Sequence, residues 1–162
     1  MKKIILGLVA IVIVIVVGLF VYKGGYLQST PKSKTPIIFS MDVEVDNPIK
    51  TRVFWTKDQA DKISNKQQVS QKVEAGKSTV EIVLPTDSVY KIRLDFGSNP
   101  GKITVYNLKI TGANEVVLDV NKFRSFNKDV EKHEVIDDKL VITSTKKHPY
   151  GFYKDPLNVT SY

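Results

Sequence analysis

The sequence predicts an all-β domain, an antiparallel two-sheet sandwich of jelly-roll type, preceded by one N-terminal transmembrane helix. Three observations predict this fold. The chain begins with a long uncharged stretch, no later segment keeps a 3.6-residue period, and short segments of alternating apolar and polar residues recur between turn residues. Roughly eight short strands at this spacing are typical of an antiparallel sandwich or barrel.

The membrane helix is predicted by the run from Ile4 to Tyr22, which contains no charged residue. At about 1.5 Å per residue a helix of this length spans about 28 Å, close to the thickness of a bilayer's hydrocarbon core. Lys2 and Lys3 precede the run and Lys23 ends it, a charge bias that places the N-terminus in the cytoplasm. We therefore expect a single-pass signal-anchor in the cell membrane, in contact with the lipid bilayer, with the domain on the extracytoplasmic side.

A cleaved signal peptide is the main alternative, because it also begins with lysines and an apolar stretch. Cleavable apolar stretches are usually about 7–15 residues long and end at small residues. Here the run is longer and ends in Phe20, Val21 and Tyr22. A buried helix of a soluble protein fits less well, since the run is apolar on every side. With no cysteine, the chain has no lipoprotein anchor, disulfide or thiolate metal site.

The chain divides by composition into four parts. These are a membrane anchor over residues 1–23 with its helix at about 4–22, a flexible linker over 24–36 that is rich in Gly, Ser, Thr and Pro, a β-sandwich domain over 37–155, and a tail over 156–162. The first 35 residues hold five lysines and no acid, so 24 basic residues minus these five leaves 19, against 17 acidic residues. A domain so nearly neutral is not expected to bind nucleic acid.

The strands are expected in order along the domain, and the clearest runs from Tyr90 to Phe96, where apolar and charged residues alternate. Residues 57–72 are polar and predict a long loop with at most one turn of helix. Pro85 ends one strand, because proline cannot donate to a ladder. The expected strands are Ile37–Val45, Lys50–Thr56, Thr79–Leu84, Tyr90–Phe96, Lys102–Thr111, Val116–Val120, Glu134–Ile136, Lys139–Ser144 and Gly151–Tyr153, with Ile82, Ile92, Leu94, Val105 and Ile142 in the core.

Two irregular features are also predicted. In the strand over residues 102–111, the apolar alternation slips by one position between Val105 and Leu108. A β-bulge near Tyr106–Asn107 would return the apolar residues on both sides of it to the core. The Gly- and Pro-containing segment over residues 97–101 is expected to be a structural reversal rather than a ligand site.

No catalytic group of residues stands out, so we expect the chain to have no enzymatic activity and to bind no cofactor. Asp42, Glu44 and Asp46 alternate with valines and share one strand face, where three carboxylates could coordinate Ca²⁺. A solvated outer face explains them better, and no glycine follows Asp46 as a helix–loop–helix calcium loop requires. The two histidines, His133 and His148, belong to no paired metal motif and are expected at the surface.

The aromatic residues are the best candidates for a ligand site. Phe54 and Trp55 are adjacent, and successive side chains of a strand alternate, so one ring should lie outside the core or at its rim. Exposed rings stack on the apolar faces of sugars. Core packing is the alternative for each ring taken singly. The candidate glycan-contact residues are Trp55, Tyr106, Tyr150 and Tyr153.

Three stretches carry a resemblance to a known family: VFWTKDQADKISNKQQVSQKVEAGKSTVEIVLP, YKIRLDFGSNPGKITVYNLKITG and IDDKLVITSTKKHPYGFY. In order and spacing they resemble the extracytoplasmic jelly-roll domain attached to some bacterial membrane glycosyltransferases and polysaccharide-assembly proteins. The resemblance spans residues 37–155 and implies a sandwich like a carbohydrate-binding module, without a defined reaction. This chain departs from the family in having a single predicted span and no transferase domain.

The resemblance implies two kinds of partner, a cell-envelope polysaccharide or a membrane glycosyltransferase complex. The expected function is therefore to bind glycan or to act as an accessory or scaffold in envelope polysaccharide assembly. A purely structural protein–protein interaction subunit of a membrane complex is the alternative. An exposed, concave aromatic patch would favour glycan binding, whereas a flat apolar patch would favour protein contact.

Overall fold

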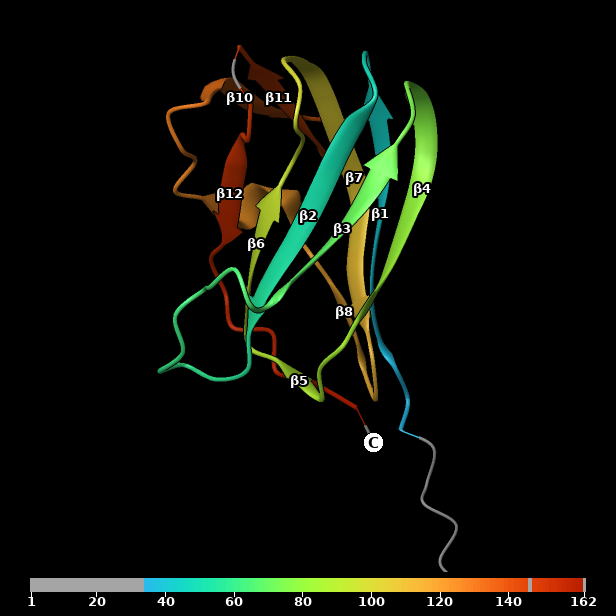
Figure 1. Cartoon of the computed structure of the whole chain (residues 1–162), viewed down its shortest axis with the longest axis vertical. Helices are drawn as coiled ribbons and strands as arrows, with labels where there is room; N and C mark the ends of the chain where they lie inside the picture. Colours follow the sequence, from blue (N-terminus) through green and yellow to red (C-terminus); the bar gives the residue numbers. More distant parts are fainter. Residues whose placement is uncertain (1–33, 146, 162) are drawn as a thin grey trace, which may run out of the picture. The chain divides into compact units, whose positions relative to one another are not determined.

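A computed structural model describes residues 34–145 and 147–161, and this part of the chain is all-β (Figure 1). Its strands form two antiparallel sheets and one short two-stranded pair. The predicted anchor at Ile4–Tyr22 lies outside the described residues. Among the residues that are described, no helix has the length and apolar character needed to cross a bilayer.

The larger sheet, here sheet A, has the strand order β10-β11-β7-β1-β4, with β8 paired to β7 beyond that path. Its long central strands pair in register over most of their length, so their inward residues meet in layers. The strands are β1 (Ile37–Val45), β4 (Gly76–Leu84), β7 (Gly101–Thr111), β8 (Glu115–Val117), β10 (Val130–Ile136) and β11 (Lys139–Ser144).

The second sheet, sheet B, has the order β3-β2-β6-β12-β9. In Figure 1 its strands β2 and β3 pass in front of β1 and β7 of sheet A. A short pair and one 3-10 turn complete the described elements. The strands of sheet B are β2 (Ile49–Thr56), β3 (Gln68–Val73), β6 (Lys91–Asp95), β9 (Phe123–Arg124) and β12 (Tyr150–Tyr153); the pair is β5 (Ser88–Val89) with β13 (Val159–Thr160), and the turn is η1 (Val120–Lys122).

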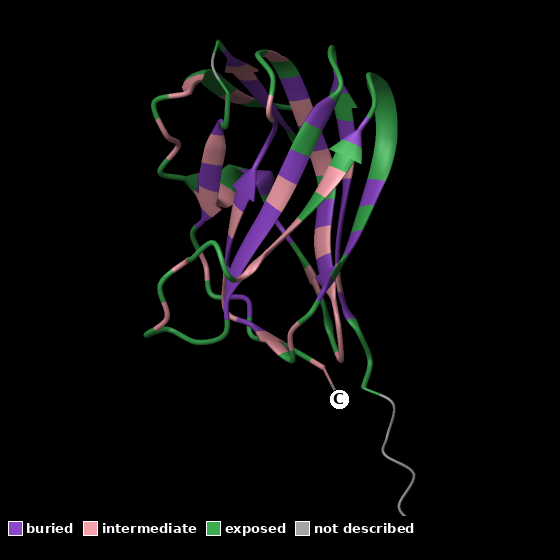
Figure 2. Cartoon of the chain, viewed as in Figure 1, coloured by how far each residue is buried: buried purple, intermediate pink, exposed green. Residues whose placement is uncertain are grey.

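One hydrophobic core lies between the two sheets. Buried and more exposed residues alternate in the first half of β2 and in the second half of β4, as the striped colouring in Figure 2 shows. The alternation follows from the strand period of two, which sends every second side chain to the same face. The five residues predicted for the core are all buried, which confirms that prediction: Ile82, Ile92, Leu94, Val105 and Ile142.

The predicted bulge in β7 is confirmed. Opposite β1, the register shifts between Ser40 and Asp42, where β7 contributes one extra residue. Asn107 takes a φ of 51° at this point, in the left-handed region that Asn tolerates better than most residues. The extra residue restores Leu108 and Ile110 to the inner face, and both are fully buried.

The prediction of one long loop over residues 57–72 was wrong, because β3 occupies its second half. As an edge strand, β3 pairs only with β2 and needs few inward apolar residues. Val69 and Val73 face inward, while its outward positions are all polar. This composition hid the strand, and only residues 57–67 remain as the loop.

Residues 156–161, predicted as a tail, belong to the packed domain. Leu157 and Val159 are buried, and Val159 pairs with Val89 in the β5–β13 ladder. The Ser161 amide also donates a hydrogen bond to the Asp87 carbonyl at 2.9 Å. The domain boundary therefore lies beyond residue 155.

The turn over residues 97–101 is tied to the start of β2. A Cβ added to Gly97 would lie 3.2 Å from side-chain atoms of Ile49, so the turn packs closely there. Gly101 has a φ of +144°, a conformation that residues with a side chain rarely adopt. The Ser98 hydroxyl accepts a hydrogen bond from the Lys50 amide at 3.0 Å, which fixes the turn beside the outer surface of sheet B.

Candidate functional site

The outward side chains of sheet B lie in ordered rows across its strands, and we call this surface the outer face of sheet B. Its residues alternate with the core residues of the same strands. Strand pairing sets the rows, because residues in register share a face. One row holds Ser70, Arg52, Asp95 and Tyr150; the next holds Gln68, Phe54, Arg93, Phe152 and Arg124.

Arg93 forms the centre of this face by stacking between two aromatic rings. Its guanidinium carbon lies 3.7 Å from the centroid of the Phe54 ring and 4.6 Å from that of Tyr150. Arg and aromatic faces attract because the ring quadrupole is negative over its face. Phe54 is only 1% exposed although it points away from the core, so the cation and its neighbours cover the ring.

A buried carboxylate holds the two arginines in place. Asp95 is 2% exposed and accepts a hydrogen bond from Arg93 Nε at 2.9 Å. Its other oxygen lies 3.3 Å from Arg52 Nη2. Burial raises the pKa of Asp95 above its ordinary value, and the positive charges of Arg93 and Arg52 offset part of that rise. The carboxylate is thus paired inside the face and is not presented to solvent.

His148 joins the loop before β12 to this cluster. Arg52 Nη2 lies 2.7 Å from His148 Nδ1, and since a guanidinium can only donate, the imidazole nitrogen accepts. The His148 carbonyl accepts a hydrogen bond from Asn127 Nδ2 at 3.0 Å, and Asn127 Oδ1 accepts one from the Tyr150 amide, also at 3.0 Å. These contacts fix the start of β12.

Of the four predicted glycan-contact residues, the structure places only Tyr150 on the outer face of sheet B. Tyr150 is half-buried and meets the Phe152 ring edge-on, with 5.7 Å between centroids. Tyr106 lies on β7 of the other sheet, with Lys139 Nζ 4.9 Å from its ring. Both of these rings remain accessible in part.

The expectation that Trp55 and Tyr153 are exposed is corrected. Trp55 is 3% exposed and packs in the core, because it is Phe54 that takes the outward position on β2. Tyr153 is 6% exposed, packs edge-on against Phe123 with 5.4 Å between ring centroids, and accepts a hydrogen bond from the Asp119 amide. Neither ring reaches the surface, so neither can stack on a ligand in this structure.

The sequence interpretation gave no role to Arg52 or Arg93, and it chose Trp55 rather than Phe54 as the outward ring of β2. The alternation in Tyr90–Phe96 already placed Arg93 on the outside, and the pair Phe54–Trp55 required one outward ring. What was missing was the pairing of β2 with β6, which sets Phe54 opposite Arg93. No local pattern reveals the register of two strands whose paired residues, such as Phe54 and Arg93, lie 39 positions apart along the chain.

The carboxylates weighed as a calcium site are held by separate partners on sheet A. Asp42 accepts hydrogen bonds from Thr79 and Asn107, each at 2.7 Å, and these two bonds lower the pKa of Asp42. Glu44 pairs with Lys77, and Asp46 accepts from the Lys102 amide. The described ranges contain no group of three or more His, Cys, Asp or Glu side chains placed to hold a metal ion.

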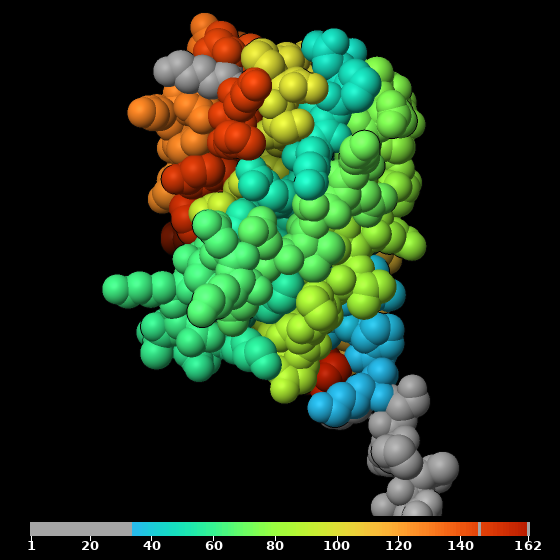
Figure 3. Space-filling model, viewed as in Figure 1, coloured from blue at the N-terminus to red at the C-terminus, as the bar shows by residue number. Residues whose placement is uncertain are grey.

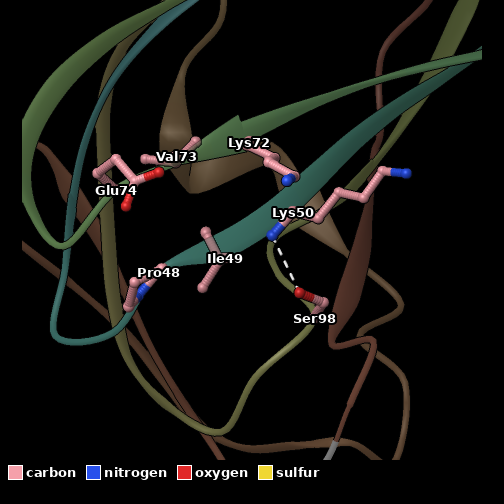
Figure 4. Close-up of a pocket in the computed structure, with 7 residues that line it drawn as sticks. All are labelled: Pro48, Ile49, Lys50, Lys72, Val73, Glu74 and Ser98. Atoms are coloured by element: carbon pink, nitrogen blue, oxygen red, sulfur yellow. Dashed lines mark hydrogen bonds between the residues drawn. The ribbon is translucent and has the colours of Figure 1, made fainter.

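At one end of the outer face of sheet B lies an open pocket of about 250 Å³. Figure 4 shows Lys50 of β2 and Lys72 of β3 at its border, with the Ser98 hydroxyl hydrogen-bonded to the Lys50 amide. Lys50 and Lys72 are paired directly across the two strands. Figure 3 looks onto this side of the molecule, where the loop of residues 57–67 projects at the lower left.

The chain matches no family model, no curated protein and no solved structure in the three comparisons made. The resemblance to the jelly-roll domain of membrane glycosyltransferases therefore stays a prediction that rests on the quoted motifs.

Proposed function

We propose that this chain is a membrane-anchored, extracytoplasmic β-sandwich of jelly-roll type that binds glycan, as an accessory or scaffold in cell-envelope polysaccharide assembly. One observation supports this best. Tyr150 and Phe152 lie half-exposed, side by side on the outer face of sheet B, with Arg93 on the adjacent strand β6. Rings offer the apolar faces of sugars a stacking surface, and guanidinium groups donate to hydroxyls.

The rings are held in place before any ligand arrives. Arg93 stacks on Tyr150, and the Tyr150 amide donates to Asn127, so the ring sits on a fixed strand with a fixed neighbour. A surface ordered in advance loses little conformational entropy on binding. This suits a shallow glycan site, where each stacked sugar contributes modestly and a tether raises the local concentration of sites.

The membrane location rests on the uncharged run Ile4–Tyr22 and its flanking lysines. The lipid bilayer is then one partner, and an envelope polysaccharide or a membrane glycosyltransferase complex the other. No enzymatic step is part of this function, since the paired groups on the outer face of sheet B serve packing and charge neutralisation.

The test is retention of cell-envelope glycans on an array by the purified full-length chain in non-ionic detergent. Tyr150→Ala should weaken binding about tenfold, because removal of one stacking ring costs of the order of 1–1.5 kcal/mol. Tyr106→Ala is the matched control, since it removes a half-buried tyrosine from the other sheet. Equal loss in both variants, with both still folded, would show that the site is not on sheet B.

A second candidate function, a protein-interaction subunit, is favoured by one observation. Val135 and Ile136 are 37% and 50% exposed on β10, which is an edge strand of sheet A. Edge strands pair with added strands of a partner. Chemical crosslinking in membranes distinguishes this candidate: a crosslinked partner lost in Val135→Lys but kept in Tyr150→Ala would support protein docking at β10.

A further inference from the structure

The outer face of sheet B is strongly basic, although the domain as a whole is nearly neutral. Asp95, the one acid within its five strands, is buried and paired with two arginines, so it does not repel an anion at the surface. The outward basic residues on its five strands are Lys50, Arg52, Lys72, Lys91, Arg93 and Arg124. Charge of one sign on one face is the arrangement that attracts ligands of the opposite charge.

Lys50 and Lys72 indicate most clearly which charge a ligand of this face carries. They lie directly opposite each other on β2 and β3, and like charges in that position destabilise an antiparallel pair. Within the part of the chain that the structure describes, neither lysine forms an ion pair. Glu74 also lines their pocket, so the pocket holds two positive charges and one negative charge. An anion bound between the lysines would remove the repulsion.

The next cation along β2 continues the same surface. Arg52 follows Lys50 by two residues on the same face, a separation of about 6.6–6.8 Å along a strand. The contacts of Arg52 with Asp95 and His148 use only Nη2, and a guanidinium has five N–H donors. Donors thus remain on Arg52 for a further acidic group, in the row that also holds Tyr150.

We propose, on the basis of the glycan-binding function above, that the ligand is an acidic polysaccharide. Its carboxylate or phosphate groups lie between Lys50 and Lys72 and beside Arg52, while its sugar rings stack on Tyr150 and Phe152. The combination of cations and rings in adjacent rows carries this assignment. A neutral glycan would use the rings and leave the lysine pair repelling.

A glycan fits these observations better than a nucleic acid. Nucleic-acid-binding domains are usually basic overall, because most of their affinity comes from phosphate contacts. Outside the first 35 residues this chain has 24 minus five, that is 19, basic residues against 17 acidic ones. The basic character is confined to one face that also offers rings for stacking.

The experiment measures binding of the full-length chain, in non-ionic detergent, to four immobilised polymers. Polygalacturonate offers carboxylates, its methyl ester offers the same backbone without charge, poly(glycerol phosphate) offers phosphates, and poly(dT) represents nucleic acid. We expect polygalacturonate or poly(glycerol phosphate) to bind at least about tenfold more tightly than the methyl ester, and the difference to shrink as salt is raised. Which of the two acidic polymers binds identifies the acidic group.

A matched pair of double variants locates the contact. Lys50→Gln with Lys72→Gln should lower affinity for the acidic polymer about five- to tenfold, since two exposed charge contacts are lost. Lys77→Gln with Lys109→Gln, which removes the same charge from sheet A, should leave it unchanged. The first pair should not lower the thermal midpoint, because it removes a like-charge pair from the sheet.

The outcomes separate the two proposals. Equal affinity for polygalacturonate and its methyl ester, both weakened by Tyr150→Ala, would overturn the acidic ligand and leave glycan binding standing. Unchanged affinity in the Lys50/Lys72 double variant would also overturn the placement of the acidic group. Tightest binding to poly(dT) would overturn the acidic polysaccharide in favour of nucleic acid. Failure to bind any of the polymers or any array glycan would overturn both proposals.

Discussion

The outer faces of the two sheets differ in how their charged and aromatic side chains are paired and buried. On sheet A the outward charges meet opposite charges in solvent, as in Glu44 with Lys77 and Lys109 with Glu115. On sheet B an aromatic ring and a carboxylate, Phe54 and Asp95, are buried on the side facing away from the core. A two-layer sandwich needs burial only between its layers. Burial on an outer face is therefore an added feature, which here orders arginines and rings into one surface.

The largest effect that separates the two faces is expected from Phe54→Ala. Deleting a buried phenylalanine typically costs about 3–5 kcal/mol of unfolding free energy. The control on sheet A is Val83→Ala, whose side chain is 60% exposed and whose loss should change stability by less than about 0.5 kcal/mol. Urea denaturation of both variants checks this, and similar costs would show that the outer face of sheet B is no better packed than that of sheet A.

Arg93→Ala should come next in size. It removes the cation stacked on Phe54 and one of the two partners of the buried Asp95 carboxylate. Removing a partner from a buried ion pair costs about 3 kcal/mol or more, because a buried charge is left unbalanced. Lys109→Ala breaks an exposed pair and should cost only about 0.2–1 kcal/mol. If both variants lowered the thermal unfolding midpoint equally, the stacked arginine would contribute no more to stability than a surface lysine.

The bulge on sheet A gives a smaller, local effect. Asn107→Ala places an alanine at a φ of 51° and removes the hydrogen bond to Asp42, so we expect a loss of about 1–2 kcal/mol. Asn107→Gly keeps the left-handed backbone accessible and should lose less. Chemical denaturation compares them, and an alanine variant as stable as the glycine variant would rule out backbone conformation as the cause.

Acid should act in opposite directions on the two faces, with the smallest expected effect. Hydrogen bonds lower the pKa of Asp42 in the folded state, so its stabilisation is present above its unfolded pKa of about 3.9 and is lost as pH falls through the folded pKa. The pKa of Asp95 is raised, so protonation as pH falls through that value favours the folded state. Melting curves from neutral pH to about pH 3 should show a weaker acid loss in Asp42→Asn than in the unmodified chain.

The sheets were predictable from the sequence where inward and outward residues differ in polarity. The alternation of Tyr90–Phe96 and the slipped alternation in β7 predicted a strand and a bulge that the structure bears out. The edge strand β3 was missed because it buries few apolar residues. The arrangement on the outer face of sheet B was missed for another reason: Arg93 meets Phe54 and Tyr150 only through strand pairing between distant segments, and register is a property of the whole fold.

The burial of Trp55 supplies the domain with its own optical reporter. It is the single tryptophan of the chain, it sits in the core, and among the described residues its indole N–H has no hydrogen-bond partner. An indole in such an apolar, unbonded setting should emit at short wavelength and shift to the red when water reaches it. Since the ring faces away from the outer face of sheet B, polymer binding there should leave this emission in place, while any loss of the fold should move it.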